Sequence, residues 1–264
     1  MILKVEDTAK VEKLFENTTD TVIISCLQKV MGDIYVNVEN EKDIPKSAKA
    51  VLGDFCFVVG DVDEALLTDT PDAVNKQFSI IVPENEEWSK QIEKTFGDLC
   101  QRKIRYGMKK EPDVFDIDKL QKMSENLSDE YEYRLIDGEL FDTCINTEWC
   151  RDFVSNFDSY KHFEKYGLGV VILKDGEIVA GASSYSGYLE GREIEIVTRE
   201  DYRRKGLARC AGSRMVLECL KRNLYPSWDA ANLMSVGLAK QLGYNESGEY
   251  VCYHVDKTHE NKCN

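Results

Sequence analysis

The chain has 264 residues, of which 42% are hydrophobic and 31% charged, and its formal net charge at pH 7 is −14. No apolar run is long enough to span a bilayer, and the residues after Met1 lack the form of a signal peptide, so we expect a cytoplasmic protein. The acidic balance opposes binding to nucleic acid or to anionic membranes and favours cationic partners.

The first half of the chain alternates strand-like and helical patterns. Its apolar strand candidates are Thr21 to Leu27, Ile34 to Val38, Phe55 to Val59 and Phe78 to Val82. Between these and the second half, Trp88, Ile92 and Phe96 recur at four-residue spacing, which is typical of a helix. This alternation predicts a smaller α/β domain over residues 1–115.

A boundary between two domains is expected in the polar segment 112–131. There, Ile117, Leu120 and Leu127 predict a connecting helix. The length of the chain agrees with two units, since domains of about 100 to 200 residues are typical. The preceding basic stretch, Arg102 to Tyr106, predicts the polar face of a strand that joins the domains, with anion binding as the alternative.

The second half contains four further strand candidates. They are Tyr131 to Leu135, Val170 to Leu173, Ile178 to Tyr185 and Glu193 to Thr198. Asp175 and Gly176 predict a hairpin turn between two apolar runs, and Glu190 to Arg192 predicts a looser turn. The segment from Glu139 to Tyr166 predicts two helices broken near Asn146.

A basic loop separates the last of these strands from an amphipathic helix. It consists of Arg203, Arg204, Lys205, Gly206, Leu207 and Ala208, with Arg209 directly after it. The unpaired amides and positive dipole end of a helix attract an anion, and Gly206 lets a diphosphate approach the backbone. The loop therefore predicts a phosphate site, while a basic turn that merely starts a surface helix is the alternative.

The loop resembles the Arg/Gln-x-x-Gly-x-Gly/Ala signature of the GNAT superfamily of N-acetyltransferases, in which it holds the pyrophosphate of acetyl-coenzyme A. The resemblance continues, because Trp228 to Asn232 precedes a second helical pattern that Gly243 ends. It implies an α/β (α+β) fold, a GNAT-type mixed and mostly antiparallel sheet with flanking helices over residues 128–264. A degenerate second copy in the first half stays open, although no repeat is visible.

Several stretches resemble one branch of this superfamily, which contains the zwittermicin A resistance acetyltransferases. They are Gly53 to Phe57, Lys109 to Pro112, Lys174 to Ser184 and Trp228 to Asn232. The resemblance covers essentially the whole chain, but its specific motifs lie after Gly167.

The resemblance also implies how acetyl-coenzyme A is bound. In this family the strand before the loop splays from its neighbour, so the backbone of Ile196, Val197 and Thr198 would pair with the pantetheine arm. Asn232 resembles the family asparagine that bonds the pantetheine region, and Ser235 lies one turn later on the same face. Ordinary sheet pairing of the strand and simple helix capping by Asn232 are the alternatives.

Acetyl transfer from a thioester to an amine needs a base for the amine and a proton for the departing thiolate. Glu193 and Glu195 are the candidate bases, because strand alternation places both on one face. A solvated face, or salt bridges to Arg192 and Arg199, would explain the same residues. The proton donor is open, because Ala239 stands where the family often has a tyrosine; the alternatives are Tyr244, Tyr253, Ser235 and water.

Nine cysteines without Cys-x-x-Cys pairs, and three histidines without metal spacing, predict reduced thiols and no metal site. We expect an acetyl-coenzyme A-dependent N-acetyltransferase that acts on a primary amine of a small molecule, such as an antibiotic or a polyamine-like amine, by direct transfer in a ternary complex. The alternative is a non-catalytic acyl-coenzyme A sensor or interaction module with the same fold. Neither the acceptor nor the oligomeric state is indicated.

Overall fold

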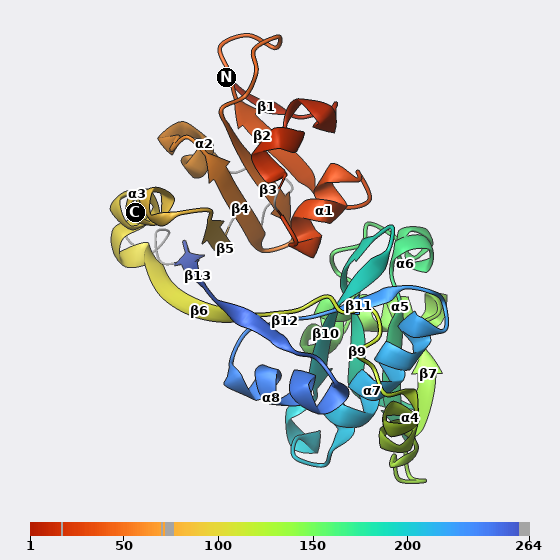
Figure 1. Cartoon of the computed structure of the whole chain (residues 1–264). Coiled ribbons are helices and arrows are strands. Elements are labelled where there is room, and N and C mark those ends of the chain that lie inside the picture. Colours follow the sequence, from red (N-terminus) through yellow and green to blue (C-terminus); the bar gives the residue numbers. More distant parts are fainter. Residues whose placement is uncertain (17, 70, 72–76, 259–264) are drawn as a thin grey trace. The chain divides into compact units, whose positions relative to one another are not determined.

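The computed structural model describes residues 1–16, 18–69, 71 and 77–258, and the chain forms two compact units (Figure 1). Unit 1 consists of Met1–Arg105 together with the residues from Tyr250 onward, and unit 2 of Tyr106–Glu249. The predicted domain ranges, 1–115 and 128–264, stay a prediction. They differ from the two units in that the last strand of the chain belongs mainly to unit 1.

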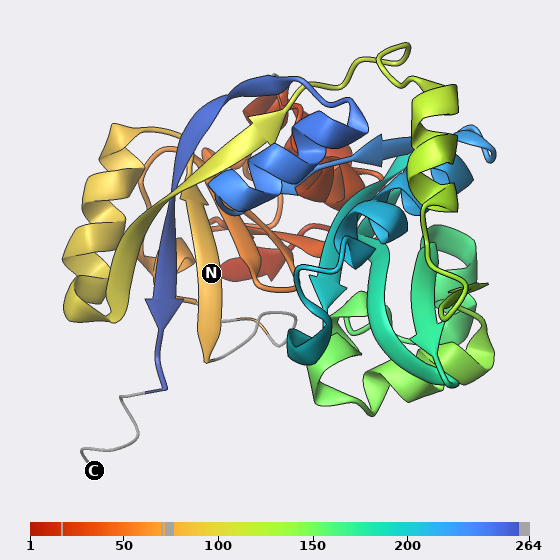
Figure 2. The same cartoon turned by 90° about the horizontal axis from the view of Figure 1, so that it is seen from below.

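Unit 1 is built on one sheet. In spatial order, its strands are β1 (Ile2–Lys4), β2 (Asp33–Asn37), β3 (Ser47–Leu52), β4 (Phe55–Gly60), β5 (Phe78–Pro83), β13 (Glu246–Asp256) and β6 (Cys100–Met108). Its helices are α1 (Thr21–Leu27), α2 (Glu64–Thr68) and α3 (Glu86–Phe96), with 3-10 turns η1 (Thr8–Lys10), η2 (Glu12–Phe15) and η3 (Gly97–Leu99). β4 and β5 are parallel. Figure 2 shows β13 lying between β5 and β6.

One strand predicted in this unit is wrong, because Thr21 to Leu27 forms helix α1. Asp20 caps the helix, since its Oδ1 accepts hydrogen bonds from the amides of Val22 (2.9 Å) and Ile23 (3.4 Å). Most of the helix is buried, and its sequence is mainly apolar and rich in β-branched residues, so it resembles a buried strand. The other three predicted strands are confirmed as β2, β4 and β5, and the predicted helix as α3.

Unit 2 contains a mixed, mostly antiparallel sheet with flanking helices, which confirms the predicted fold class. In spatial order its strands are β11 (Tyr225–Ser227), β10 (Gly191–Thr198), β9 (Glu177–Tyr188), β8 (Gly169–Lys174) and β7 (Glu132–Leu135), and the short β12 (Asp229–Ala230) pairs separately with Tyr106 and Gly107 of β6. The helices are α4 (Ile117–Glu125), α5 (Gly138–Ile145), α6 (Tyr160–Tyr166), α7 (Leu207–Leu220) and α8 (Leu233–Leu242), with 3-10 turns η4 (Glu148–Phe153) and η5 (Glu200–Tyr202). No described helix is long and apolar enough to cross a membrane.

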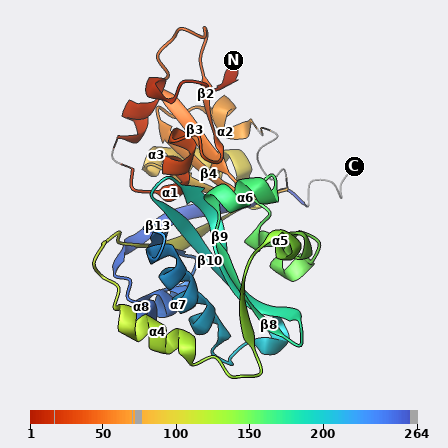
Figure 3. The same ribbon diagram turned by 90° about the vertical axis from the view of Figure 1, so that its right-hand side faces the viewer.

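The two faces of this sheet are covered by different helices (Figure 3). Helix α7 packs on one face, where a Cβ on its Gly212 would lie 2.8 Å from Cδ1 of Ile196. On the other face, Ser183 Oγ donates a hydrogen bond to the carbonyl of Phe153 in η4 (2.6 Å). Because Glu195 is the register partner of Ser183 on β9, its side chain points to the η4 face. Glu193, two residues away on the same strand, points the same way.

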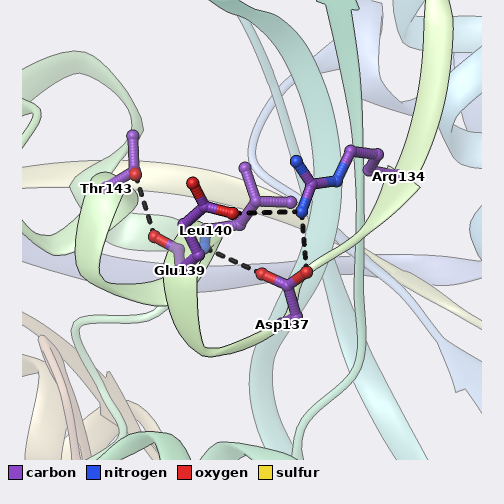
Figure 4. Close-up of polar contacts among 5 residues, drawn as sticks. All are labelled: Arg134, Asp137, Glu139, Leu140 and Thr143. Carbon is purple, nitrogen blue, oxygen red and sulfur yellow. Dashed lines mark hydrogen bonds and ion pairs between the residues drawn. The ribbon is translucent and has the colours of Figure 1, made fainter. Parts of the chain in front are cut away.

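Helix α5, which follows the first strand of unit 2, has a reinforced N-terminus (Figure 4). Oδ1 of Asp137 accepts a hydrogen bond from the amide of Leu140 (3.0 Å), and its Oδ2 lies 2.7 Å from Nη2 of Arg134 on β7. Thr143 Oγ1 donates to the carbonyl of Glu139 one turn later (2.8 Å). The cap and the ion pair together fix where the strand ends and the helix begins.

The chain has the same order of elements in two successive segments, β1 to β6 and β7 to β13. Each begins with a strand and helical turns, continues with three consecutive antiparallel strands, and then has a helix, a strand parallel to the third of these, a further helix and a last strand. β10, α7 and β11 of unit 2 therefore correspond to β4, α2 and β5 of unit 1. The first segment therefore repeats the topology of the second, as the alternative of a degenerate second copy in the first half predicts. This repeat cannot be seen in the sequence, because the two segments share the order and pairing of their strands and helices and no visible sequence pattern.

Candidate active site

The basic loop after β10 is wound into two left-handed positions. Arg204 has a φ of 63° and Gly206 a φ of 82°, and Gly206 occupies the N-cap of α7 without any capping side chain. A Cβ built on Gly206 would meet no atom within 4 Å, so open space lies over this backbone. The sequence therefore places its glycine where a ligand can approach the first turn of the helix.

The amides of this loop are available to a ligand. Among the described residues, none accepts a hydrogen bond from the amides of residues 204–208, whereas those of Arg209 and Cys210 bond to the carbonyl of Gly206 (3.1 and 3.2 Å). Consecutive free N–H groups at the positive end of a helix form an anion site. The structure thus brings Gly206, Leu207 and Ala208 together through their backbone; the Leu207 side chain is buried in the core.

The basic side chains of the loop have different surroundings. Arg203 Nη1 lies 3.9 Å from Glu200 Oε1, and Lys205 Nζ lies 4.4 Å from the ring centre of Tyr202. Arg204 and Arg209 are exposed and have no ion-pair partner among the residues that the structure describes. These two arginines are the cations that an incoming phosphate can use without breaking an existing pair.

The edge of β10 that faces away from β9 is open over most of its length. β11 pairs with β10 only at residues 191–193, and the chain then leaves to form β12. The amide of Arg199 bonds to the β9 carbonyl of Val179 (3.0 Å), so by alternation Ile196 and Thr198 direct their backbone groups to the open edge. Val197 instead directs its backbone to β9. Of the three predicted backbone contacts, two are therefore placed for strand addition.

Glu193 and Glu195 lie on the η4 face next to the point where this open edge begins. Glu193 is only 9% exposed, and Glu195 is half-buried. A bulge lies opposite them, since Glu193 pairs with Ser186 and Ile194 with Ser184, which leaves Tyr185 of β9 as the extra residue. The carboxylates are thus held on a strand whose regular pairing changes at their position.

The arginines next to these glutamates bond to other groups. Nη1 of Arg192 donates to the carbonyls of Tyr188 (2.9 Å) and Gly191 (2.7 Å) from the α7 face of the sheet. Arg199 forms a two-pronged contact with Asp201, with nitrogen–oxygen distances of 2.9 and 3.1 Å. Arg192 and Arg199 therefore bond to groups other than Glu193 and Glu195, and the alternative of salt bridges to these two arginines is not observed.

The Glu193 carboxylate contributes to the raised pKa values of three tyrosines. Burial raises the pKa of Tyr188 to about 12, and the Glu193 carboxylate adds to the shift. Burial likewise raises the pKa of Tyr225, and that of Tyr244 well above its ordinary value, again with a contribution from Glu193. Tyr188 and Tyr225 were missed in the sequence, because their places relative to Glu193 depend on the pairing of β9 and of β11 with β10.

Asn232 and Ser235 lie together at the start of α8. Oδ1 of Asn232 accepts a hydrogen bond from the amide of Ser235 (3.0 Å), and Ser235 Oγ accepts one from Nε1 of Trp228 (3.1 Å). Asn232 is therefore the N-cap of the helix, and it is also exposed. Capping uses one acceptor of the amide and leaves its NH₂ group for a ligand.

The other proton-donor candidates are already engaged. The hydroxyl of Tyr244 donates to the carbonyl of Pro226 (2.7 Å), and that of Tyr253, which belongs to unit 1, donates to Glu93 Oε1 (2.7 Å). Ala239 is fully buried in the core of unit 2. No group of three or more potential metal ligands occurs among the described residues; His259 lies outside them.

The model of the GNAT acetyltransferase family matches residues 12–253. The chain therefore belongs to the GNAT acetyltransferases, a family of acyltransferases that uses acetyl-coenzyme A. A solved GCN5-related N-acetyltransferase-like protein from Streptococcus suis is 42% identical, with a TM-score of 0.87 over 95% of this chain and 98% of that one.

Two further relatives are more distant. The uncharacterized N-acetyltransferase YdfB of Bacillus subtilis is 30% identical over 114 residues, so the match spans 42% of the length of that curated relative. A tandem GNAT protein from the clavulanic acid biosynthesis pathway shares the fold, with a TM-score of 0.55 at 9% identity over 97% of this chain and 98% of that one. The likeness to a tandem protein agrees with the repeated element order of the two units.

Proposed function

We propose that this protein is an N-acetyltransferase that transfers the acetyl group of acetyl-coenzyme A to a primary amine of a small molecule within a ternary complex. The observation that carries the proposal is the run of free amides at residues 204–208 next to the open edge of β10. A diphosphate and an amide-bearing arm are the ligand groups that such a loop and edge accept.

The residues present fit acetyl-coenzyme A in two places. Its pyrophosphate would bond to the loop amides, with Arg204 and Arg209 as free cations and Arg203 and Lys205 nearby. Its pantetheine amides would pair with Ile196 and Thr198, as an added strand does. The exposed amide group of Asn232 is available beside this edge.

Glu193 and Glu195 are the proposed bases. An amine reaches the reaction as an ammonium, and it must lose a proton before its nitrogen can attack the thioester carbon. A carboxylate held on the η4 face takes that proton directly or through water. Direct attack forms the amide in one transfer without an acetylated enzyme, which is why both substrates have to be bound together.

The acceptor is proposed to be a small cationic amine. The net charge of −14 and the carboxylates on the reacting face both favour a positively charged molecule. The zwittermicin A resistance branch, which the sequence resembles, makes an antibiotic amine one such acceptor, and a polyamine is another. The eight free cysteines among the described residues agree with a reducing compartment, and we propose the cytoplasm.

The phosphate loop can be tested with a matched pair of variants. Gly206 and Gly176 both have a φ of 82° and open space around a built Cβ, but Gly176 lies in the hairpin between β8 and β9. Gly206→Leu is expected to abolish binding of acetyl-coenzyme A in calorimetry, because the side chain would cover the amides. Gly176→Leu carries the same backbone strain and is expected to keep binding. Equal binding by both variants would refute the loop assignment.

A further inference from the structure

The departing thiolate of coenzyme A needs a proton or a strong hydrogen-bond donor. The family position for a tyrosine is held here by Ala239, whose side chain is fully buried. The Tyr244 hydroxyl donates to the carbonyl of Pro226, whereas Ser235 Oγ accepts a hydrogen bond from Trp228 Nε1 and keeps its own proton. We therefore sought the donor where the reacting sulfur would lie.

The open edge of β10 fixes that place, and this step rests on the proposed binding of acetyl-coenzyme A. An arm that starts at the phosphate loop and pairs along residues 194–198 covers roughly 16 Å of strand. It stops where β11 joins β10, at the register pair Glu193 and Ser227. The thioester at the end of the arm would consequently reach this fork between the two strands.

Two buried hydroxyl groups meet at the fork. Oγ of Ser227 lies 2.8 Å from the hydroxyl of Tyr188, and the two residues are 2% and 3% exposed. Tyr188 reaches Ser227 by lying across Gly191, since a Cβ on that glycine would collide with the phenol oxygen. Register partners on neighbouring strands point to the same face, so Ser227 and Glu193 both face the reacting side.

We propose that the Ser227 hydroxyl protonates the departing thiolate and that Tyr188 positions Ser227 and resupplies its proton. The amine, whose ammonium proton has already passed to solvent, bonds through nitrogen to the acetyl carbon and gives its second proton to Glu193; the carbon–sulfur bond breaks with its electron pair on sulfur, and sulfur takes the proton of Ser227 Oγ. Ser227 regains a proton from Tyr188, and Tyr188 from Glu193. Amide and free thiol leave, and the enzyme is unchanged.

The surroundings of Tyr188 suit a relay that stays neutral. Its pKa, about 12, keeps the phenol protonated at neutral pH, with burial as the main cause and with Glu193, Tyr225 and Glu190 as the neighbouring acidic groups. The Lys110 ammonium lies 5.0 Å from the centre of its ring and steadies negative charge that develops on the oxygen during transfer. A hydroxyl pair of this kind passes a proton without either group remaining ionised.

The test compares three changes at the fork with one control. Ser227→Ala is expected to lower kcat by about 100-fold, at the lower end of general-acid effects, with KM for acetyl-coenzyme A unchanged. Ser227→Thr keeps a hydroxyl and is expected to restore kcat, and Tyr188→Phe to lower kcat but not to change KM. Ser186→Ala removes another buried hydroxyl, from the register partner of Glu193 on β9, and is expected to leave kcat unchanged.

Assays use spermidine, cadaverine and glucosamine as acceptors, and thermal melting checks that each variant is folded. Full turnover by folded Ser227→Ala, or equal losses in Ser227→Ala and Ser227→Thr, would overturn the proposal. A crystal structure of the wild-type protein with coenzyme A tests the same proposal without an activity assay. The sulfur of coenzyme A is expected within hydrogen-bond distance of Ser227 Oγ, and a sulfur elsewhere would refute the role of Ser227 as proton donor. If the wild-type protein does not bind coenzyme A at all, the proposed function itself is refuted.

Discussion

The two carboxylates of β10 occupy different environments although they share one face. Glu193 is almost fully buried at the fork, while Glu195 is half-buried beside the open edge. Their common face and different exposure make each a separate candidate base, so each is tested by its own variant.

We predict that Glu193→Gln and Glu195→Gln each lower kcat by about 100-fold or more and keep the affinity for acetyl-coenzyme A, since glutamine preserves shape and removes the base. Steady-state kinetics and calorimetry measure the two effects separately. The control is Glu132→Gln, which changes an exposed glutamate of β7 in the same sheet. If both β10 variants turn over like the control, the bases lie elsewhere.

At this scale, strand alternation was sufficient to place Glu193 and Glu195 on one face, and the loop glycine was sufficient to locate the backbone of the proposed anion site. Tyr188 and Ser227 could not be predicted in the same way. Their contact depends on the register of β11 against β10 and on the missing side chain of Gly191, and neither is visible as a local pattern.

Among the elements, α5 begins with a cap that can be measured independently of catalysis. The pKa of Asp137 is held below its ordinary 3.8, first by the hydrogen bond from the Leu140 amide and then by Arg134. A lowered folded-state pKa contributes stability that is present above the unfolded pKa and is lost as the pH falls through the folded one. The contribution is therefore lost progressively in acid, beginning below about pH 4.

We predict that Asp137→Ala lowers the free energy of unfolding by about 1 kcal/mol at pH 7, the typical value of an N-cap. Chemical denaturation of the variant and of wild type at pH 7 and at pH 3 gives the difference, which should shrink at the lower pH. Asp142→Ala is the control, because Asp142 is an exposed aspartate in the same helix and caps nothing. A pH-independent loss would mean that the aspartate acts through packing.

Two of the elements that the sequence could not predict, α1 and β3, are extensively buried. Helix α1 resembled a strand because its exposed face is too small to show a helical period. Strand β3 was missed because all six of its residues are buried, including Lys49, whose Nζ donates to the carbonyls of Leu66 (2.6 Å) and Asp69 (2.5 Å). Periodicity predicts an element only when one side of it meets water.

On the scale of the whole molecule, the two copies of the fold exchange their last strands. β13 follows the helices of the second copy, yet its residues from Tyr253 to Asp256 pair with β5 of unit 1. β6 follows the helices of the first copy, and its Tyr106 and Gly107 pair with β12 of unit 2. This exchange cannot be seen in the sequence, because any strand of suitable pattern could fill either place.

Unit 1 has lost the features that make unit 2 a binding site. Its β4 is paired with β5 over four residues, and its end is closed by Trp88 Nε1, which donates to the carbonyl of Gly60 (2.9 Å). The following loop is acidic, and Asp63 fills the start of α2 by accepting a hydrogen bond from the Leu66 amide (2.9 Å). A carboxylate at a helix N-terminus occupies the place of a phosphate and repels one.

We therefore predict that the full-length protein binds one molecule of acetyl-coenzyme A per chain, in unit 2. Calorimetric titration should give a stoichiometry near one, and Gly206→Leu should remove all of the binding heat, because in the described part of unit 1 β5 pairs along β4 and the Asp63 carboxylate lies at the start of α2. Asp63→Asn serves as the control in unit 1: asparagine still caps the helix, so neither stoichiometry nor affinity should change. A second saturable site that survives in Gly206→Leu would show that unit 1 also binds the cosubstrate.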